Sequence, residues 1–192
     1  LGNISNVQLG VPVAINIENG IAAMALAQLG GVSNEDIKTG MASFRGVDRR
    51  FDFKIKTDKV VYLSDYAHHP EEIKQSILSM RALYEGKRLT GIFQPHLYTR
   101  TRDFYQEFAE SLSLLDEVIL TDIYPARELP IEGVSSQLIY DNLRPDIDKT
   151  LCKKEEVIDI LKKKEIEVLM TLGAGDIENY APQICEILNE RC

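Results

Sequence analysis

Short apolar runs alternate with longer amphipathic stretches over most of the chain after residue 50. Five runs have the length and the β-branched content of strands. They lie at residues 51–56, 60–63, 89–94, 117–122 and 167–172. Helical periodicity fills the intervals, at residues 71–84, 101–115, 135–143, 153–164 and 176–190. Strands that alternate with helices of this length build βαβ units, so the pattern predicts an α/β fold with a mostly parallel sheet flanked by helices.

The first 50 residues have a different pattern, which predicts two helices and no sheet. An alanine-rich helix covers residues 19–29, and two glycines end it. Ser33 or Asn34 caps a second helix, which runs to about residue 44. Because no neighbouring strand is available to cover them, these helices are typical of the end of a larger domain. We therefore predict a domain boundary close to residue 50.

Four of the predicted strands are followed by loops rich in titratable side chains. These loops are residues 65–70, 94–102, 121–128 and 172–177. The first loop contains Asp65, Tyr66 and two of the three histidines, His68 and His69. The carboxyl ends of parallel strands meet at one edge of a sheet, so the four loops are expected to lie together. Carboxylates, imidazoles and arginines at such an edge favour a site for phosphate and carboxylate groups.

Each of these features also has a purely structural explanation. The histidines of the first loop can cap the helix that follows, and Arg100 and Arg102 can form ion pairs on a helix surface. Gly173 and Gly175 can serve only a tight turn, since the third glycine of the dinucleotide-binding fingerprint is absent from the sequence. The sequence also contains no Walker-type lysine loop, so this chain carries no phosphate cradle of that kind.

Composition and charge narrow the class of protein. The 192 residues are 44% hydrophobic and 27% charged, as in ordinary globular proteins, and the formal net charge is −8. This charge argues against nucleic-acid or anionic-membrane binding as the main role, and no apolar run has the length of a membrane span. Cysteines without metal-binding spacing predict reduced thiols in a cytoplasmic protein. The three cysteines are Cys152, Cys185 and Cys192.

Six sequence strings, taken together, resemble the Mur ligase family. They occur in the family's order over nearly the whole chain, and the combination is far more specific than any one string. The strings are NIEN at 16–19, FRGVDRRF at 44–51, DYAHHPEE at 65–72, FQPH at 93–96 with YTRTRD at 98–103, TDIYPARE at 121–128 with GVSS at 133–136, and GAGDI at 173–177.

The resemblance implies a domain organisation and a reaction. Residues 1–50 would be the end of the family's central ATP-binding domain, and residues 51–192 its C-terminal Rossmann-like domain. The phosphate loop and the Mg²⁺ ligands would then lie in another part of a longer protein, so no metal ligand is expected in this chain. The family's alanine-adding branch uses ATP to convert a carboxyl group of UDP-N-acetylmuramate into an acyl phosphate, which the amine of L-alanine attacks. This amide ligation belongs to peptidoglycan precursor synthesis, and this chain alone is expected to be inactive.

The resemblance also assigns roles on the nucleotide side of the site. Asn16 and Asn19 would contact the adenine, because an amide can both donate and accept at a base edge. Arg50 would reach the ATP phosphates with its fixed positive charge. Asp65 would hold the ribose or phosphate side of the nucleotide, and Tyr66 would pack against it.

On the amino-acid side, the resemblance points to His68, His96 and Arg100. Arg100 would bind the carboxylate of alanine, and a neutral imidazole would orient or deprotonate its ammonium group. The strings leave open which histidine does so. The chain departs from the family pattern at Ile15, where a histidine is usual, and at Leu97, where many members have arginine. The second departure shifts more of the carboxylate binding to Arg100.

Two alternatives remain open at this stage. Within the family, a recycling ligase joins a tripeptide to UDP-N-acetylmuramate; the string at 98–102 is more typical of the alanine-adding branch. Outside the enzymes, a standalone nucleotide-binding or regulatory module would also explain the missing lysine loop. The two helices without a sheet argue against such a module.

Overall fold

The computed structural model describes residues 2–11 and 13–191. The chain forms two compact units, Leu1–Val47 and Asp48–Cys192. This boundary lies close to the one expected near residue 50. Each unit is described by itself below.

The first unit consists of two helices and irregular segments. Helix α1 covers Ala14–Leu29 and helix α2 covers Asn34–Ser43, so α1 begins earlier than the predicted residue 19. Ser33 is the N-cap of α2, as expected, and its hydroxyl oxygen accepts a hydrogen bond from the main-chain N–H of Asp36 at 3.1 Å. Several large apolar side chains of α1 are exposed, from 48% at Ile17 to 74% at Leu29. The predicted helices are therefore present, and part of their apolar surface is uncovered.

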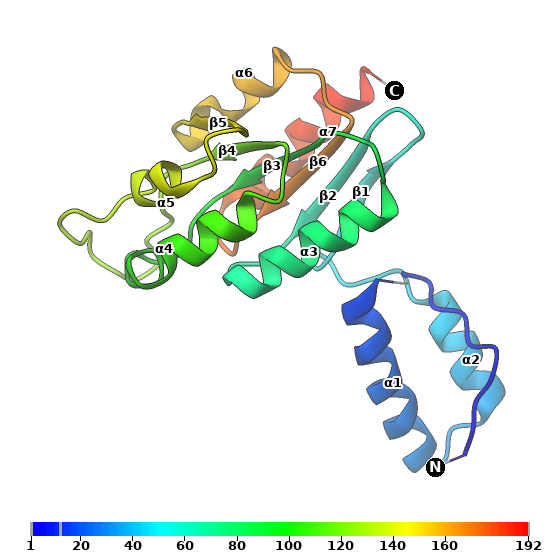
Figure 1. The fold of residues 1–192 in the computed structure, drawn as a ribbon. Helices are drawn as coiled ribbons and strands as arrows, with labels where there is room; N and C mark the ends of the chain where they lie inside the picture. Colours follow the sequence, from blue (N-terminus) through cyan, green and yellow to red (C-terminus); the bar gives the residue numbers. More distant parts are fainter. Residues whose placement is uncertain (1, 12, 192) are drawn as a thin grey trace. The chain divides into compact units, whose positions relative to one another are not determined.

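The second unit is built on a six-stranded sheet with the order β1-β2-β6-β3-β4-β5 (Figure 1). The strands are β1 Asp52–Lys56, β2 Val61–Asp65, β3 Leu89–Phe93, β4 Glu117–Leu120, β5 Asp148–Leu151 and β6 Val168–Leu172. Strand β1 runs antiparallel to β2, with an irregular register between Phe53 and Ile55, and the other pairs are parallel. The prediction of a mostly parallel sheet is confirmed.

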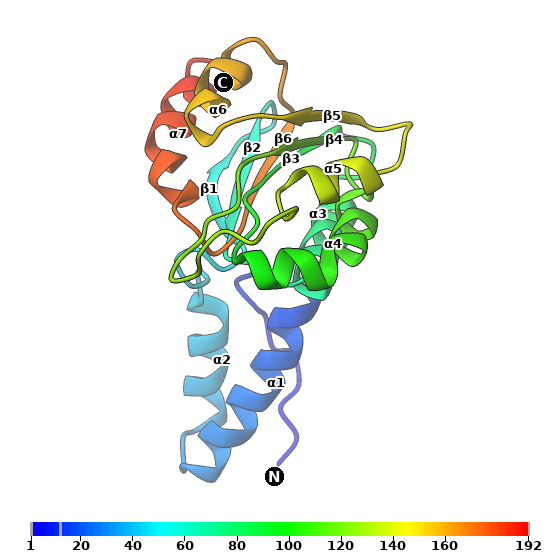
Figure 2. The ribbon, with the colours of Figure 1, turned by 90° about the vertical axis from the view of Figure 1, so that its left-hand side faces the viewer.

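Helices cover both faces of this sheet (Figures 1 and 2). One face carries α3 Pro70–Leu83, α4 Tyr98–Leu112 and α5 Gln137–Asn142, and the other carries α6 Val157–Lys162 and α7 Ala181–Asn189. Short 3₁₀ helices, η1 Lys154–Glu156 and η2 Ile177–Tyr180, precede α6 and α7. Every residue of the central strands β3 and β6 is buried, which explains why their sequences are mostly apolar and do not alternate.

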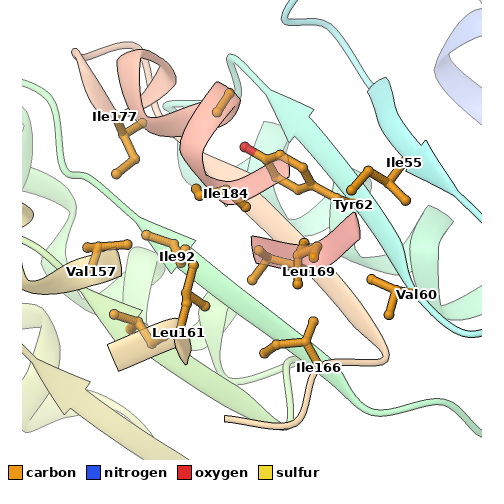
Figure 3. Close-up of a cluster of buried hydrophobic side chains, with 13 residues drawn as sticks. Ile55, Val60, Tyr62, Ile92, Val157, Leu161, Ile166, Leu169, Ile177 and Ile184 are labelled. Atoms are coloured by element: carbon orange, nitrogen blue, oxygen red, sulfur yellow. The ribbon is translucent and has the colours of Figure 1, made fainter. Parts of the chain in front are cut away.

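The core beneath α6 and α7 shows why the apolar pattern predicts these elements (Figure 3). Tyr62, Ile92 and Leu169 come from adjacent strands and belong to one buried cluster with Val157 and Ile184 of the two helices. The Tyr62 hydroxyl shares a hydrogen bond of 3.1 Å with the Thr171 hydroxyl, so the one polar group of this ring has a partner. Burial raises the pKa of Tyr62 above its usual range.

Strand β5 is the one strand absent from the sequence-based expectation. It lies at the edge of the sheet, pairs only with β4, and has the polar sequence Asp-Lys-Thr-Leu. Its first and last residues are exposed, so no apolar run or alternation marks it. Helix α4 also differs from expectation, because it begins at Tyr98 rather than near residue 101.

Two general expectations concern the membrane and the cysteines. In the part of the chain that the structure describes, no helix has the length and apolar character needed to cross a bilayer. Cys152 and Cys185 are free thiols, and Cys192 lies outside the described residues. Burial raises the pKa of Cys152 to about 11, which disfavours its reactive thiolate at neutral pH.

Candidate functional site

The four predicted loops follow neighbouring strands and so share one edge of the sheet. In the order β2, β6, β3, β4, the loop after β6 lies between the loops after β2 and β3. Main-chain hydrogen bonds continue beyond the strand ends, from Gly173 N–H to the Asp65 carbonyl at 3.2 Å and from Gln94 N–H to the Leu172 carbonyl at 3.1 Å. The predicted convergence of these loops at the carboxyl edge is confirmed.

The side chain of Gln94 fixes the loop after β6. Its Nε2 donates to Asp176 at 2.8 Å, and its Oε1 accepts from the main-chain N–H of Ile177 at 2.9 Å. Asp176 also forms an ion pair with Lys154. Gln94 is buried although it is polar, and its two hydrogen bonds give the amide nitrogen and the amide oxygen one partner each. Sequence reasoning missed Gln94, whose one visible signal is a polar residue directly after an apolar strand.

The two glycines of this loop are required by the approach of Gln94. Gly173 has a φ of +133°, and a Cβ placed there would lie 2.6 Å from the Gln94 carbonyl oxygen. A Cβ at Gly175 would lie 2.2 Å from Gln94 Oε1. The structural explanation of these glycines is therefore sufficient, and no dinucleotide fingerprint is needed to account for them.

Asp65 is a half-buried carboxylate at the end of β2. It accepts hydrogen bonds from the Ser76 hydroxyl at 2.7 Å and from the main-chain N–H of Ala67 at 3.3 Å, and the N–H of Phe51 also faces it. Burial raises the pKa of Asp65 despite these donors. The carboxylate is held in place at the cost of desolvation, which is common for groups placed for function.

We expect Asp65→Asn to stabilise the chain at pH 7, by roughly 1 kcal/mol. The amide oxygen would keep the main-chain donors, and the NH₂ group could donate to Ser76. Because the folded-state pKa of Asp65 lies above its unfolded value, the folded wild type binds its proton more tightly. As the pH falls through the folded-state pKa of Asp65, the free energy of unfolding of the wild type therefore rises relative to that of Asp65→Asn.

Urea denaturation at pH 7 and at about pH 4, near the ordinary pKa of an aspartate, would measure this difference. The advantage of Asp65→Asn should be larger at pH 7. A variant that is less stable than wild type at both values would show that the charge is compensated by interactions stronger than those seen here. The control is Ser79→Ala, on α3, the helix that also carries Ser76; this variant should show no such pH dependence.

The ring of Tyr66 lies beneath the guanidinium group of Arg49. The Arg49 guanidinium carbon is 4.8 Å from the centre of the Tyr66 ring, and its Nη2 donates to the Gly175 carbonyl at 3.3 Å. The main chains also bond, from Tyr66 N–H to the Arg49 carbonyl at 2.6 Å. The Arg50 side chain is exposed. Its predicted contact with ATP phosphates stays a prediction, and Arg49 is a residue of this site that the sequence strings did not single out.

The structure brings His68 and His96 together from two different loops. Their ring centres are 6.2 Å apart. The His68 ring also lies edge-on to Tyr66 at 5.2 Å, whereas the His96 ring is stacked on Tyr124 at 5.7 Å. Both histidines are half-buried. His69, by contrast, packs against Phe104 at 5.2 Å and is exposed.

Arg100 joins the histidine pair from the first turn of α4. Its Nη1 lies 3.4 Å from His96 Nδ1. Burial lowers the pKa of His96, and the positive charge of Arg100 and the nearby His68 lower it further. Arg102 instead pairs with the adjacent Asp103 at 2.7 Å on the exposed side of the helix. The surface explanation is thus right for Arg102, and the site explanation is supported for Arg100.

The start of α4 is held in an unusual conformation. Leu97, its N-cap, has a φ of +74°, and its N–H donates to the Tyr124 carbonyl at 3.0 Å. Glu128 accepts from the main-chain N–H of Thr99 at 3.0 Å and also from the Thr99 hydroxyl. The loop after β4 therefore contributes to the site by positioning the helix turn that carries Arg100.

Other predicted site residues lie in the first unit. Asn16 is half-buried, and its Nδ2 donates to the Val11 carbonyl at 3.2 Å, whereas Asn19 is exposed. Their predicted contact with adenine stays a prediction. The side chain of Ile15 lies outside those that the structure describes. Among the described residues, no group of three or more His, Cys, Asp or Glu side chains is arranged to hold a metal ion.

Comparison with known sequences identifies Mur ligases as the relatives of this chain. A family model described as "Mur ligase, glutamate ligase domain" matches residues 49–177. A UDP-N-acetylmuramate–L-alanine ligase of Phocaeicola vulgatus is 77% identical over 191 residues, which are 100% of this chain and 42% of that protein. The ligase of the same name from Porphyromonas gingivalis (strain W83) is 53% identical over 192 residues, with the same coverage of both chains. The chain thus spans about two-fifths of the length of the curated relatives it matches.

Solved structures agree with the sequence comparison. The crystal structure of the UDP-N-acetylmuramate-alanine ligase of Thermotoga maritima matches with a TM-score of 0.80 and 27% identity, over 97% of this chain and 40% of that one. A murein peptide ligase of Psychrobacter arcticus matches with a TM-score of 0.67 and 19% identity, over 95% and 38% of the two chains. The second match is a likeness of fold alone.

Proposed function

This chain belongs to the Mur ligase family, and on that premise we propose that it is the C-terminal part of an ATP-dependent ligase that joins L-alanine to UDP-N-acetylmuramate. The observation that carries the proposal is the 77% identity to a ligase of that name along the whole chain. The convergence of His68, His96 and Arg100 at the sheet edge supports it, because these groups suit an amino acid and an acyl phosphate.

In this proposal the two units of the chain belong to different domains of the enzyme. Residues 1–50 form the end of the central ATP-binding domain, and residues 51–192 form the C-terminal domain. The division of the structure at Val47 and Asp48 supports this assignment, as does the exposed apolar surface of α1. The phosphate loop and the Mg²⁺ ligands would lie in the part of the protein outside this chain.

The residues of the second unit would bind and orient the reactants. Arg100 would hold the carboxylate of alanine by charge-assisted hydrogen bonds, and the histidines would face its amino group and the acyl phosphate. Tyr66 would pack against the nucleotide, with Asp65 on its ribose or phosphate side and Arg50 near the ATP phosphates. Closure of this domain over the reactants would exclude water from the acyl phosphate.

In the first unit, Asn16 and Asn19 would contact the adenine. Their amide groups can donate and accept at the base edge, which fits the mixed donor and acceptor pattern of adenine. ATP and UDP-N-acetylmuramate as substrates would place the reaction in the cytoplasm and in peptidoglycan precursor synthesis.

Phosphate release by the full-length protein tests this function. With ATP and UDP-N-acetylmuramate, we expect release that depends on L-alanine, and we expect none from the isolated 192-residue chain under the same conditions. Release with the tripeptide but not with alanine would move the protein to the recycling branch. Nucleotide binding without any turnover of the full-length protein would favour a regulatory module instead.

A further inference from the structure

The environment of the His68 ring determines where its proton lies. Its Nδ1 faces two oxygen atoms, the Tyr66 carbonyl at 3.0 Å and Glu72 Oε2 at 3.3 Å. A carbonyl and an ionised carboxylate can only accept hydrogen bonds. The proton of a neutral His68 ring is therefore on Nδ1, and Nε2, on the opposite edge of the ring, carries a free lone pair.

Glu72 is itself fixed by the start of α3. Its Oε2 accepts from the main-chain N–H groups of His68 at 3.0 Å and His69 at 3.2 Å. Partial burial opposes ionisation, but these two donors and the adjacent His68 ring outweigh it and lower the pKa of Glu72. The carboxylate beside His68 is thus ionised at neutral pH and can accept a hydrogen bond from Nδ1–H of that ring.

His96 has the opposite arrangement. Its Nδ1 lies 3.4 Å from Nη1 of Arg100, and a guanidinium group can donate but cannot accept. Nδ1 of His96 must therefore carry a lone pair, so the ring is neutral with its proton on Nε2. Partial burial of the ring also disfavours a second proton. Two imidazoles 6.2 Å apart thus hold their protons on different nitrogens.

We propose that the two histidines have distinct roles: His68 accepts the proton of the incoming amino group, His96 donates a hydrogen bond from Nε2, and Glu72 positions His68. This inference rests on the proposed function. An N–H proton of the ammonium group moves to His68 Nε2, and the resulting imidazolium faces the Glu72 carboxylate. The freed lone pair forms the C–N bond with the acyl phosphate carbon, the C–O bond to phosphate breaks, and a second N–H proton leaves with the phosphate.

In this assignment Arg100 and Glu72 each fix the position of the proton on one histidine ring. Arg100 keeps a proton from His96 Nδ1, so His96 Nε2–H stays available as a neutral donor to an oxygen of the acyl phosphate. Glu72 holds the other ring with its lone pair at Nε2. Sequence strings cannot distinguish these roles, because both residues are histidines that follow parallel strands.

Nitrogen-15 NMR of the histidine side chains tests the proton positions in the 192-residue chain itself. The chain has three histidines, so His69→Gln and His96→Gln are enough to assign the signals. Above pH 8, we expect the proton of His68 on Nδ1 and that of His96 on Nε2. A His68 proton on Nε2, or a His96 proton on Nδ1, would overturn the assignment. This measurement needs no substrate, so it stands apart from the proposed function.

Kinetics of the full-length ligase test the roles. We expect His68→Gln to lower kcat by roughly a hundredfold and Glu72→Gln by about tenfold, with the KM for alanine changed by less than about threefold. The amide oxygen of Glu72→Gln can still accept from the main chain, so the loop should keep its fold. The control is Glu71→Gln, whose parent side chain lies on the same turn and accepts from Gln75 at 2.7 Å.

The outcomes separate the two proposals. A kcat for Glu72→Gln equal to that of Glu71→Gln, or an effect on KM alone, would refute the role of Glu72. A full-length wild type that does not use alanine would refute the proposed function, and the NMR result would still establish or reject the proton positions.

Discussion

Replacing Arg100 by alanine in the full-length ligase should raise the KM for L-alanine by roughly a hundredfold, equivalent to about 2.7 kcal/mol of lost binding. Arg100 is the guanidinium that the structure holds beside His96, and Leu97 supplies no second positive charge at the neighbouring position. A carboxylate that loses its charged partner in a half-buried site also loses most of the compensation for its desolvation. We therefore expect kcat/KM to fall with KM as the main component.

Arg102→Ala is the matched control for this change. Arg102 lies on the same helix, half a turn away, and its guanidinium is exposed and paired with Asp103. Such a surface pair contributes little, so we expect kinetics close to those of wild type. Steady-state rates at varied alanine concentration would measure both variants. An unchanged KM for Arg100→Ala would remove Arg100 from carboxylate binding, while leaving the enzyme assignment in place.

Gly173→Ala should destabilise the chain by roughly 3 kcal/mol or more. Two costs combine at this position. The φ of +133° is unfavourable for any residue with a side chain, and the new Cβ would lie 2.6 Å from the Gln94 carbonyl oxygen. That oxygen belongs to the main chain directly after β3, where Gln94 is hydrogen-bonded to the end of β6. It therefore cannot move without disturbing the loops after both strands. We also expect the full-length variant to lose most of its activity, because the same loops carry the site.

Gly86→Ala separates the two costs. Gly86 also has a positive φ, +79°, but a Cβ there would have no atom within 4 Å. We expect this variant to lose only about 1 kcal/mol, from backbone conformation alone. Urea denaturation of both variants in the 192-residue chain provides the comparison. Equal losses for the two glycines would mean that the close approach of Gln94 carries no energetic weight.

Sequence reasoning predicted most of the fold because most of its elements are buried on one or both sides. Strands such as β3 and β6 are buried throughout and mostly apolar, and the helices between strands bury one face. The exception is β5, which is exposed at both ends and paired on one side only. No pattern of burial is imposed on such a strand, so its sequence carries no signal of it.

The site, like the fold, could be predicted only in part from the sequence. The positions of His68, His96 and Arg100 after parallel strands were sufficient to predict that they lie at one edge. Two contacts there could not be predicted, that of Glu72 with His68 and that of Arg49 with Tyr66, because hydrogen bonds and ring contacts depend on side-chain directions at that edge. The two glycines illustrate the point: a sequence can show that a turn is tight, but only the coordinates show that Gln94 is the group that requires it.

The two edges of the sheet also bear on aggregation. An exposed edge strand offers unpaired N–H and C=O groups to other chains. Here β1 has an irregular register near Phe53, and the lysines Lys54 and Lys56 lie along it. The opposite edge, β5, has four residues and carries Asp148 and Lys149. Short, charged or irregular edges oppose the addition of a further strand, so this domain is protected against growth of its sheet into larger assemblies.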